Sequence, residues 1–393
     1  MTTNNGISQR EARRLLGQVR QGVPPDPDMV PYIRVGREDE ENKIVSDPVD
    51  GLESVSYGNG HVFFVLGDFG FGKSFFLNLI AERAGERDFL WSMPEIPDIG
   101  TLSNKTEFCT EIISEIRYPD QQGTGSAPLL RKFCNEMTLD EFEQMAIEHN
   151  LVGGPCYQIF KQVMKASIHN KVEVSHSKRE GYVDFADVLA GAASYMHNSE
   201  VSLDQLHAIG KNGFSSISNE DEYEYLKGIR SLAIELDYSG IVTLIDEFAE
   251  EEMDWNPDED TEKRLIDLVN KCYQKDEFTN MMFVFVGNRV RWDDLIDSAS
   301  GGHEALRHRY NAGKLELESL SKNDYTDLVQ RMAQLVSTAY NKDISLTASD
   351  CRNIVENAVS KHGSVDDISP RKLILQPTDT DADLIDMLRE AKY

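Results

Sequence analysis

Short apolar runs and amphipathic stretches alternate along much of the chain. The runs at residues 61–66, 241–245 and 281–286 are almost uninterrupted, as expected of parallel strands that are buried on both faces. A glycine-rich segment and an amphipathic stretch from Lys73 to about Glu86 follow the first run. This alternation predicts an α/β fold with a central parallel sheet.

Helical spacing of apolar residues prevails at the N-terminal end and in the middle of the chain. Residues 8–20 form an amphipathic helix with a basic face, and the proline-rich connector at 23–27 ends it. We expect a short extended piece at 33–38 and a helix at 104–117. The stretch 119–220 is predicted to be mostly helical, without a convincing ladder of strands.

The predicted elements divide the chain into three parts. Residues 1–57 hold the N-terminal helix and the segment that follows it. Residues 58–318 form the α/β domain, with a largely helical insertion at about 120–220. Residues 319–393 form a helical lid, because three periodic helices are expected at 321–340, 347–361 and 380–391.

The glycine-rich segment fits the phosphate-loop pattern G-x-x-x-x-G-K-[ST], and it lies between a strand and a helix as that mechanism requires. Its glycines let backbone N–H groups wrap a phosphate, and the helix N-terminus adds positive potential. Lys73 would reach the β- and γ-phosphates of ATP, and the Ser74 hydroxyl would ligate Mg²⁺. The predicted nucleotide-binding residues are Gly67, Asp68, Phe69, Gly70, Phe71, Gly72, Lys73, Ser74 and Phe75.

The apolar run at 241–245 ends in Asp246 and Glu247. Ligands of open α/β sheets bind at the carboxyl ends of the strands. We expect Asp246 to hold Mg²⁺ through water and Glu247 to polarise the attacking water, because phosphoryl transfer needs a positioned nucleophile.

Three further parts of the chain supply candidates for contact with the γ-phosphate. Asn288 follows the run at 281–286, beside the expected phosphate. An arginine of the segment 305–310, which holds Arg307 and Arg309, would reach the nucleotide of a neighbouring subunit and neutralise developing charge. Otherwise it is a surface arginine in a salt bridge. Arg371 lies in a helix that begins with Pro370, and it would sense the phosphate from the lid or else be a solvated charge.

The charge of the chain limits its partners. The 393 residues carry a formal net charge of −28, the wrong sign for a protein that coats nucleic acid non-specifically. Direct DNA contact would need a local basic patch, either residues 161–179 or the arginines of the first helix. Those arginines are Arg10, Arg13, Arg14 and Arg20.

The five cysteines are scattered without a C-x-x-C pair, and the longest apolar runs are too short to span a bilayer. The cysteine spacing argues against a zinc knuckle and a disulfide framework. We therefore expect a cytoplasmic protein without a membrane segment.

In this order the motifs resemble those of AAA+ ATPases: a phosphate loop, an acidic strand, a sensor asparagine, an arginine-finger segment and a lid with a sensor arginine. Residues 35–38 (VGRE) are similar to the segment near the adenine in replication-initiator ATPases of the origin-recognition type. That resemblance adds Val35, Gly36 and Arg37 to the nucleotide-binding residues. Residues 305–309 (ALRHR) are similar to the finger segment of clamp loaders, and this resemblance implies Arg309 as the finger, with Arg307 as second choice.

Nearly the whole chain resembles the ATP-binding proteins of bacteriophage exclusion (BREX) defence systems, the BrxC/BrxD group and especially the BrxD type. Residues 232–250, where a tyrosine-containing turn precedes the acidic strand, carry this resemblance most specifically. Phe71 departs from the usual phosphate loop, which has a small residue there. The other segments that carry it are residues 11–25, 35–38, 67–77 and 368–375.

The residues and the resemblance together predict a Mg²⁺-dependent ATPase that acts as motor or switch in an anti-phage complex on or near DNA. An arginine finger that acts between subunits implies a homo-oligomer, and the resemblance implies other defence proteins as partners, such as a helicase or methylase. Two alternatives remain open. One is an initiator- or loader-type switch whose DNA binding depends on ATP, and the other is a nucleotide-gated scaffold that does not hydrolyse ATP.

Overall fold

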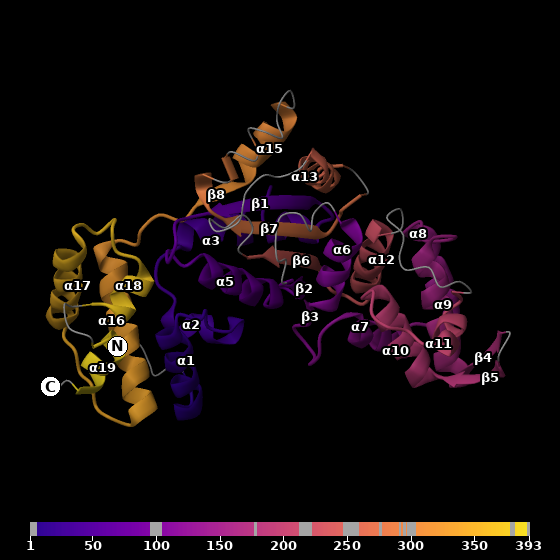
Figure 1. Ribbon diagram of the computed structural model, residues 1–393, viewed down its shortest axis with the longest axis horizontal. Coiled ribbons are helices and arrows are strands. Elements are labelled where there is room, and N and C mark those ends of the chain that lie inside the picture. The colour runs from indigo at the N-terminus through magenta and orange to yellow at the C-terminus, as the bar shows by residue number, and fades with distance from the viewer. Residues whose placement is uncertain are drawn as a thin grey trace.

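The computed structural model describes residues 6–94, 104–176, 179–211, 222–246, 259–274, 277–290, 292–293, 296, 304–377 and 382–390. In these residues, six strands form a central sheet in the order β3–β2–β6–β7–β1–β8 (Figure 1). Neighbouring strands are parallel except for β2 and β3. The strands are β1 (Gly60–Leu66), β2 (Phe89–Ser92), β3 (Ile116–Arg117), β6 (Gly240–Ile245), β7 (Met281–Gly287) and β8 (Lys314–Glu316).

The three apolar runs of the sequence are the central strands β1, β6 and β7, and every residue in them is buried. The predicted α/β fold with a parallel sheet is therefore confirmed. Strand β7 lies between β1 and β6, with Leu66 paired to Gly287 and Ile245 to Phe285. The segments that follow these three strands consequently emerge together at one edge of the sheet.

Helices cover both faces of the sheet (Figure 1). Alternate residues of β1 divide between two apolar cores, because successive strand residues point to opposite faces: Phe63 joins one core and Phe64 the other. The first face carries α3 (Glu38–Val45), α4 (Leu52–Ser56) and α5 (Lys73–Gly85). The second carries α6 (Lys105–Ser114), α12 (Glu222–Glu235), α13 (Glu259–Cys272) and α15 (Glu304–Gly313).

The insertion extends from one end of the sheet (Figure 1). It is mostly helical as expected, but β4 (Lys171–His176) and β5 (Arg179–Asp184) form an antiparallel hairpin, so the prediction that it contains no strand ladder is wrong. The helix predicted at 104–117 ends earlier, because β3 adds an edge strand. The helices of the insertion are α7 (Ser126–Glu136), α8 (Leu139–Glu148), α9 (Pro155–His169), α10 (Phe185–Met196) and α11 (Leu203–Ala208).

A helical bundle lies at the opposite end of the sheet (Figure 1). It contains α16 (Lys322–Tyr340), α17 (Ala348–His362), α18 (Pro370–Leu375) and α19 (Leu384–Glu390), and we call it the C-terminal bundle. The N-terminal helix α1 (Gln9–Gln21) packs along α16, and Leu15 and Leu16 of α1 share a core with Tyr325 and Val329 of α16. The two ends of the chain thus form one apolar unit.

Short helices connect α1 to the sheet. Helix η1 (Pro27–Met29) and α2 (Val30–Ile33) follow the proline-rich connector. The expected extended piece at 33–38 is therefore shorter than predicted, since Ile33 ends α2 and Glu38 begins α3. Among the described helices, none is both long and apolar enough to cross a bilayer.

Candidate nucleotide-binding site

The loop at residues 67–74, which we call the phosphate loop, joins β1 to α5 at the edge where β6 and β7 also end. Gly70 and Gly72 have φ angles of 85° and 88°, in the left-handed region that glycine adopts at low cost. Gly67 faces the segment after β8, and a Cβ atom there would lie 3.2 Å from the Leu317 carbonyl oxygen. Glycine at these positions permits both the turn and its close packing.

Lys73 and Ser74 are the first residues of α5, where backbone N–H groups have no intrahelical acceptor. These groups and the helix dipole favour an anion at this position. Lys73 Nζ donates to the carbonyl oxygens of Gly67 at 3.0 Å and Asp68 at 3.2 Å. The ammonium group is thereby held beside the loop that would enclose a phosphate.

Arg37 fastens the phosphate loop to the segment that leads to the C-terminal bundle. Its guanidinium donates to the carbonyl oxygens of Phe71 (3.3 Å) and Glu318, and it pairs with Glu40 at 2.9 Å. The side chain is 8% exposed. Gly36 has a φ of 60°, and a Cβ atom there would lie 2.9 Å from a methyl carbon of Leu320. The segment at 35–37 therefore lies between the loop and the bundle.

The C-terminal bundle contacts the phosphate loop through the start of α18. A Cβ atom on Gly70 would lie 2.8 Å from Ser369 Oγ. The Cζ atom of Arg371 lies 5.2 Å from the centroid of the Phe69 ring. The same guanidinium approaches Gly22 at the end of α1, where a Cβ atom would be 2.9 Å from it. Loop, bundle and N-terminal helix meet at Arg371.

These segments enclose a cavity of about 250 Å³. One end is formed by the phosphate loop from Phe69 to Phe75 together with Asp246 and Arg371. The rest is mainly apolar. Apart from Arg37 it is lined by Val19, Gly22, Val23, Pro24, Pro25, Ile33, Val35, Leu320, Leu328, Pro370 and Ile374. A polar, cationic end beside an apolar compartment suits a molecule with an anionic group and a flat, poorly hydrated ring.

Sequence reasoning missed one wall of this cavity, which α1 and the connector after it supply. Asn78 of α5 donates from Nδ2 to the Pro25 carbonyl oxygen at 2.8 Å, and this buried bond holds the connector against the α/β domain. The proline cluster at 23–27 was interpreted only as a helix stop. The apolar spacing of α1 signals that the helix packs on something, but not where.

Asp246 directly follows β6 and borders the phosphate end of the cavity. Glu247 lies outside the described residues. A carboxylate and a serine hydroxyl are oxygen donors that suit Mg²⁺, which commonly uses one or two protein ligands plus phosphate oxygens and water. Among the described residues, no cluster of three or more His, Cys, Asp or Glu side chains could hold a metal ion by itself. A Mg²⁺ ion at Ser74 and Asp246 would depend on the bound phosphates.

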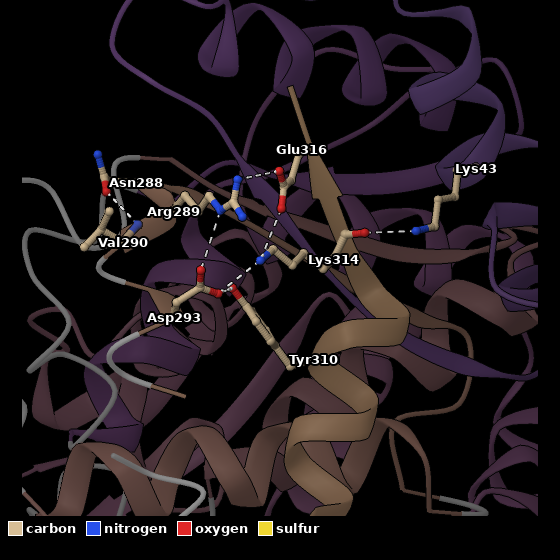
Figure 2. Close-up of polar contacts among 8 residues, drawn as sticks. All are labelled: Lys43, Asn288, Arg289, Val290, Asp293, Tyr310, Lys314 and Glu316. Carbon is tan, nitrogen blue, oxygen red and sulfur yellow. Dashed lines mark hydrogen bonds and ion pairs between the residues drawn. The ribbon is translucent and has the colours of Figure 1, made fainter. Parts of the chain in front are cut away.

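Asn288 follows β7, between the phosphate loop and Asp246 in the order of the strands, although it does not line the cavity. Its Oδ1 accepts a hydrogen bond from the Val290 N–H at 2.9 Å. Figure 2 shows that the next residue, Arg289, belongs to a network of ion pairs at this edge of the sheet. Arg289 pairs with Glu316 of β8 at 2.9 Å.

The same network reaches α15 through Asp293 (Figure 2). Asp293 accepts from the Tyr310 hydroxyl at 3.0 Å and pairs with Lys314 at 3.1 Å. Burial opposes ionisation of Asp293, but the bonds from Lys314 and Tyr310 outweigh it and lower the pKa of the carboxyl. Ion pairs thus join the segment after Asn288 to strand β8, and the Tyr310 hydroxyl ties the end of α15 to the same network.

The structure does not bring Arg307 and Arg309 into the cavity; both lie on α15. Arg307 is exposed. The Arg309 guanidinium donates to Asn270 Oδ1 on α13 and lies 5.3 Å from the centroid of the Tyr273 ring. Arg309 is therefore held within its own chain here, whereas Arg307 reaches the surface.

Most of the α1 arginines proposed for DNA contact have partners within the chain. Arg13 donates to the Ala339 carbonyl oxygen at 2.7 Å, and Arg14 lies 3.1 Å from Asp26. Arg20 pairs with Asp383 and Asp386, each at 2.7 Å. In the second candidate patch, Lys161 pairs with Glu143 at 2.6 Å.

Comparison with known sequences identifies one matching family. The family described as BREX system ATP-binding protein BrxC/D matches residues 7–207 and 213–389. The matched ranges contain every residue that lines the cavity. No curated protein matches the chain.

Proposed function

Because the chain belongs to the family of BREX system ATP-binding proteins BrxC/D, we propose that it binds ATP in the cavity at the phosphate loop and hydrolyses it. In this proposal the protein is an AAA+ ATPase that acts as motor or switch in an anti-phage complex on or near DNA. The observation that carries the proposal is the cavity itself. It joins a glycine loop, a lysine and a carboxylate to a mainly apolar compartment, and this division of polarity suits a nucleotide.

Each residue of the site has a role in this proposal. The backbone of the phosphate loop and Lys73 hold the β- and γ-phosphates. The apolar compartment, which includes Val35, receives the adenine. Glu247 orients the attacking water, Asn288 contacts the γ-phosphate, and Arg371 reads that phosphate from the C-terminal bundle, which acts as the lid.

Ser74 and Asp246 would hold Mg²⁺ with the phosphate oxygens. When bound, the ion would neutralise charge on the β- and γ-phosphates and align them for attack. The chain's own residues supply the geometry of the reaction. Lys73 and the start of α5 stabilise negative charge at the reacting end.

We further propose that the protein assembles into a homo-oligomer in which an arginine on α15 reaches the neighbouring subunit's nucleotide. Arg307 is exposed, while Arg309 contacts Asn270 of its own chain. For Arg309 to act on a neighbour, that contact must break. The family also implies partners within the defence system, and a helicase or methylase would be a suitable one. The described cysteines are free thiols, consistent with work in the reducing cytoplasm.

The direct test is ATP turnover by the purified chain with Mg²⁺, with and without duplex DNA, while its mass in solution is recorded. Glu247→Gln is expected to lower turnover about 100-fold or more while ATP binding and assembly persist, because it removes only the group that orients water. Lys73→Ala is expected to lose both binding and turnover. The control Glu251→Gln removes the same charge nearby and should leave turnover unchanged. Turnover equal in wild type and Glu247→Gln would contradict hydrolysis at this site.

A further inference from the structure

Phe69 is an unusual residue for its position. It is 74% exposed although it belongs to the phosphate loop, and it borders the cavity. A phenyl ring left in water forgoes the stabilisation of burial. The side chain that covers it is Arg371, whose Cζ atom is 5.2 Å from the ring centroid. That distance is within the range of a cation–π contact.

A second surface limits where the Arg371 guanidinium can lie. Gly22 ends α1 with a φ of 71°, and a Cβ atom there would be 2.9 Å from both Cζ and Nη2 of Arg371. Among the described residues, no carboxylate forms an ion pair with this guanidinium, and its aromatic contact is the Phe69 ring. Its N–H groups are consequently not committed to an anion of the protein.

The arginine therefore lies between two walls, beside the same end of the cavity as Lys73. Arginine has many rotamers, so holding it in one place costs conformational entropy. A guanidinium that is already stacked loses less of that freedom when it binds a phosphate. The stacking leaves the edge of the planar group, which carries its donors, available to an oxyanion.

We propose that Phe69 is a positioning residue that holds Arg371 at the phosphate end of the cavity, so that the preference for ATP over ADP depends on the Phe69–Arg371 contact. The inference rests on the proposed nucleotide site but not on hydrolysis. In this inference the phosphate loop has a second function besides binding phosphate, because its Phe69 orders the Arg371 side chain of the C-terminal bundle.

The test is a double-mutant cycle on the full chain. Calorimetric titration gives the Kd of ATPγS and of ADP, both with Mg²⁺, for wild type, Phe69→Leu, Arg371→Ala and the double variant. Phe69→Tyr keeps an aromatic ring and serves as the conservative rescue. Tyr57→Leu removes an aromatic side chain that is 79% exposed at another place, and Lys73→Ala reports whether the titrated site is the phosphate loop.

We expect Arg371→Ala to raise the Kd of ATPγS about tenfold and that of ADP little, because only ATPγS carries the third phosphate. Phe69→Leu should raise the Kd of ATPγS about two- to fivefold, as expected from losing an exposed cation–π contact. The double variant should be no weaker than Arg371→Ala alone. Phe69→Tyr and Tyr57→Leu should resemble wild type.

Additive effects in the double variant would overturn the inference, as would a Phe69→Leu effect of equal size on ADP. Either result would leave the nucleotide site itself intact. A Kd for ATPγS that Lys73→Ala does not change would overturn the proposed function as well. The two failures are thus told apart by Lys73→Ala.

Discussion

At the scale of single residues, the shape of the phosphate loop can be predicted from the sequence, whereas the contacts of Arg37 cannot. The pattern of glycines, lysine and serine predicts its own geometry, because only certain residues tolerate the loop's dihedral angles and supply its donors. Arg37 was assigned beside the base from resemblance alone. In the structure its guanidinium holds the carbonyl oxygens of Phe71 and Glu318, a contact that depends on where three distant segments meet.

Arg37→Ala is expected to remove these two charge-assisted hydrogen bonds and the ion pair with Glu40. The free energy of unfolding should fall by about 2 kcal/mol, and the extra stability that ATP confers should shrink because the phosphate loop is less ordered. Urea unfolding with and without ATP and Mg²⁺ measures both quantities. An unchanged ATP-dependent increment would show that Arg37 stabilises the fold without serving the site.

At the scale of elements, periodicity predicts most strands and helices but not which other elements they pack against. The apolar spacing of α1 predicts the helix, and its arginines are one of two basic patches that direct DNA contact could use. Three of them instead bind the C-terminal bundle or the connector. The hairpin β4–β5 was missed although Val172 and Val174 alternate with polar residues, because each strand is short and half exposed, so the period-2 signal is weak.

The packing of α1 on the C-terminal bundle can be tested at Arg20, which bonds to Asp383. This hydrogen bond is the main cause of the raised pKa of Arg20. Arg20→Ala should lower the free energy of unfolding by about 1 kcal/mol, since the pair is partly exposed. Because Val19 lines the cavity, the variant should also bind ATP several-fold more weakly, and amide exchange should rise in α1 but not in β1. Arg10→Ala, on the exposed side of α1, is the control. A variant with unchanged ATP affinity would show that α1 is only a support for the bundle.

At the scale of the whole molecule, the sequence indicated the fold class but not the arrangement that makes the site. The strand order places Asn288 between the phosphate loop and Asp246, and that order depends on hydrogen bonds between strands far apart in the chain. The cavity depends on the two ends of the chain packing together as one unit. Neither the strand order nor the packing of the two chain ends leaves a local signal in composition or periodicity. The sequence therefore predicts only a part of the apolar compartment.

The central claim is that one nucleotide site lies between the phosphate loop, the N-terminal segment and the C-terminal bundle. Photo-crosslinking with 8-azido-ATP and Mg²⁺, followed by mapping of the labelled peptides, tests it most directly. We predict label in residues 19–35 or 320–328, which line the apolar compartment, and loss of that label in Lys73→Ala or with excess ATP. Specific label confined to the insertion between β3 and α12, or label that Lys73→Ala leaves unchanged, would contradict the account.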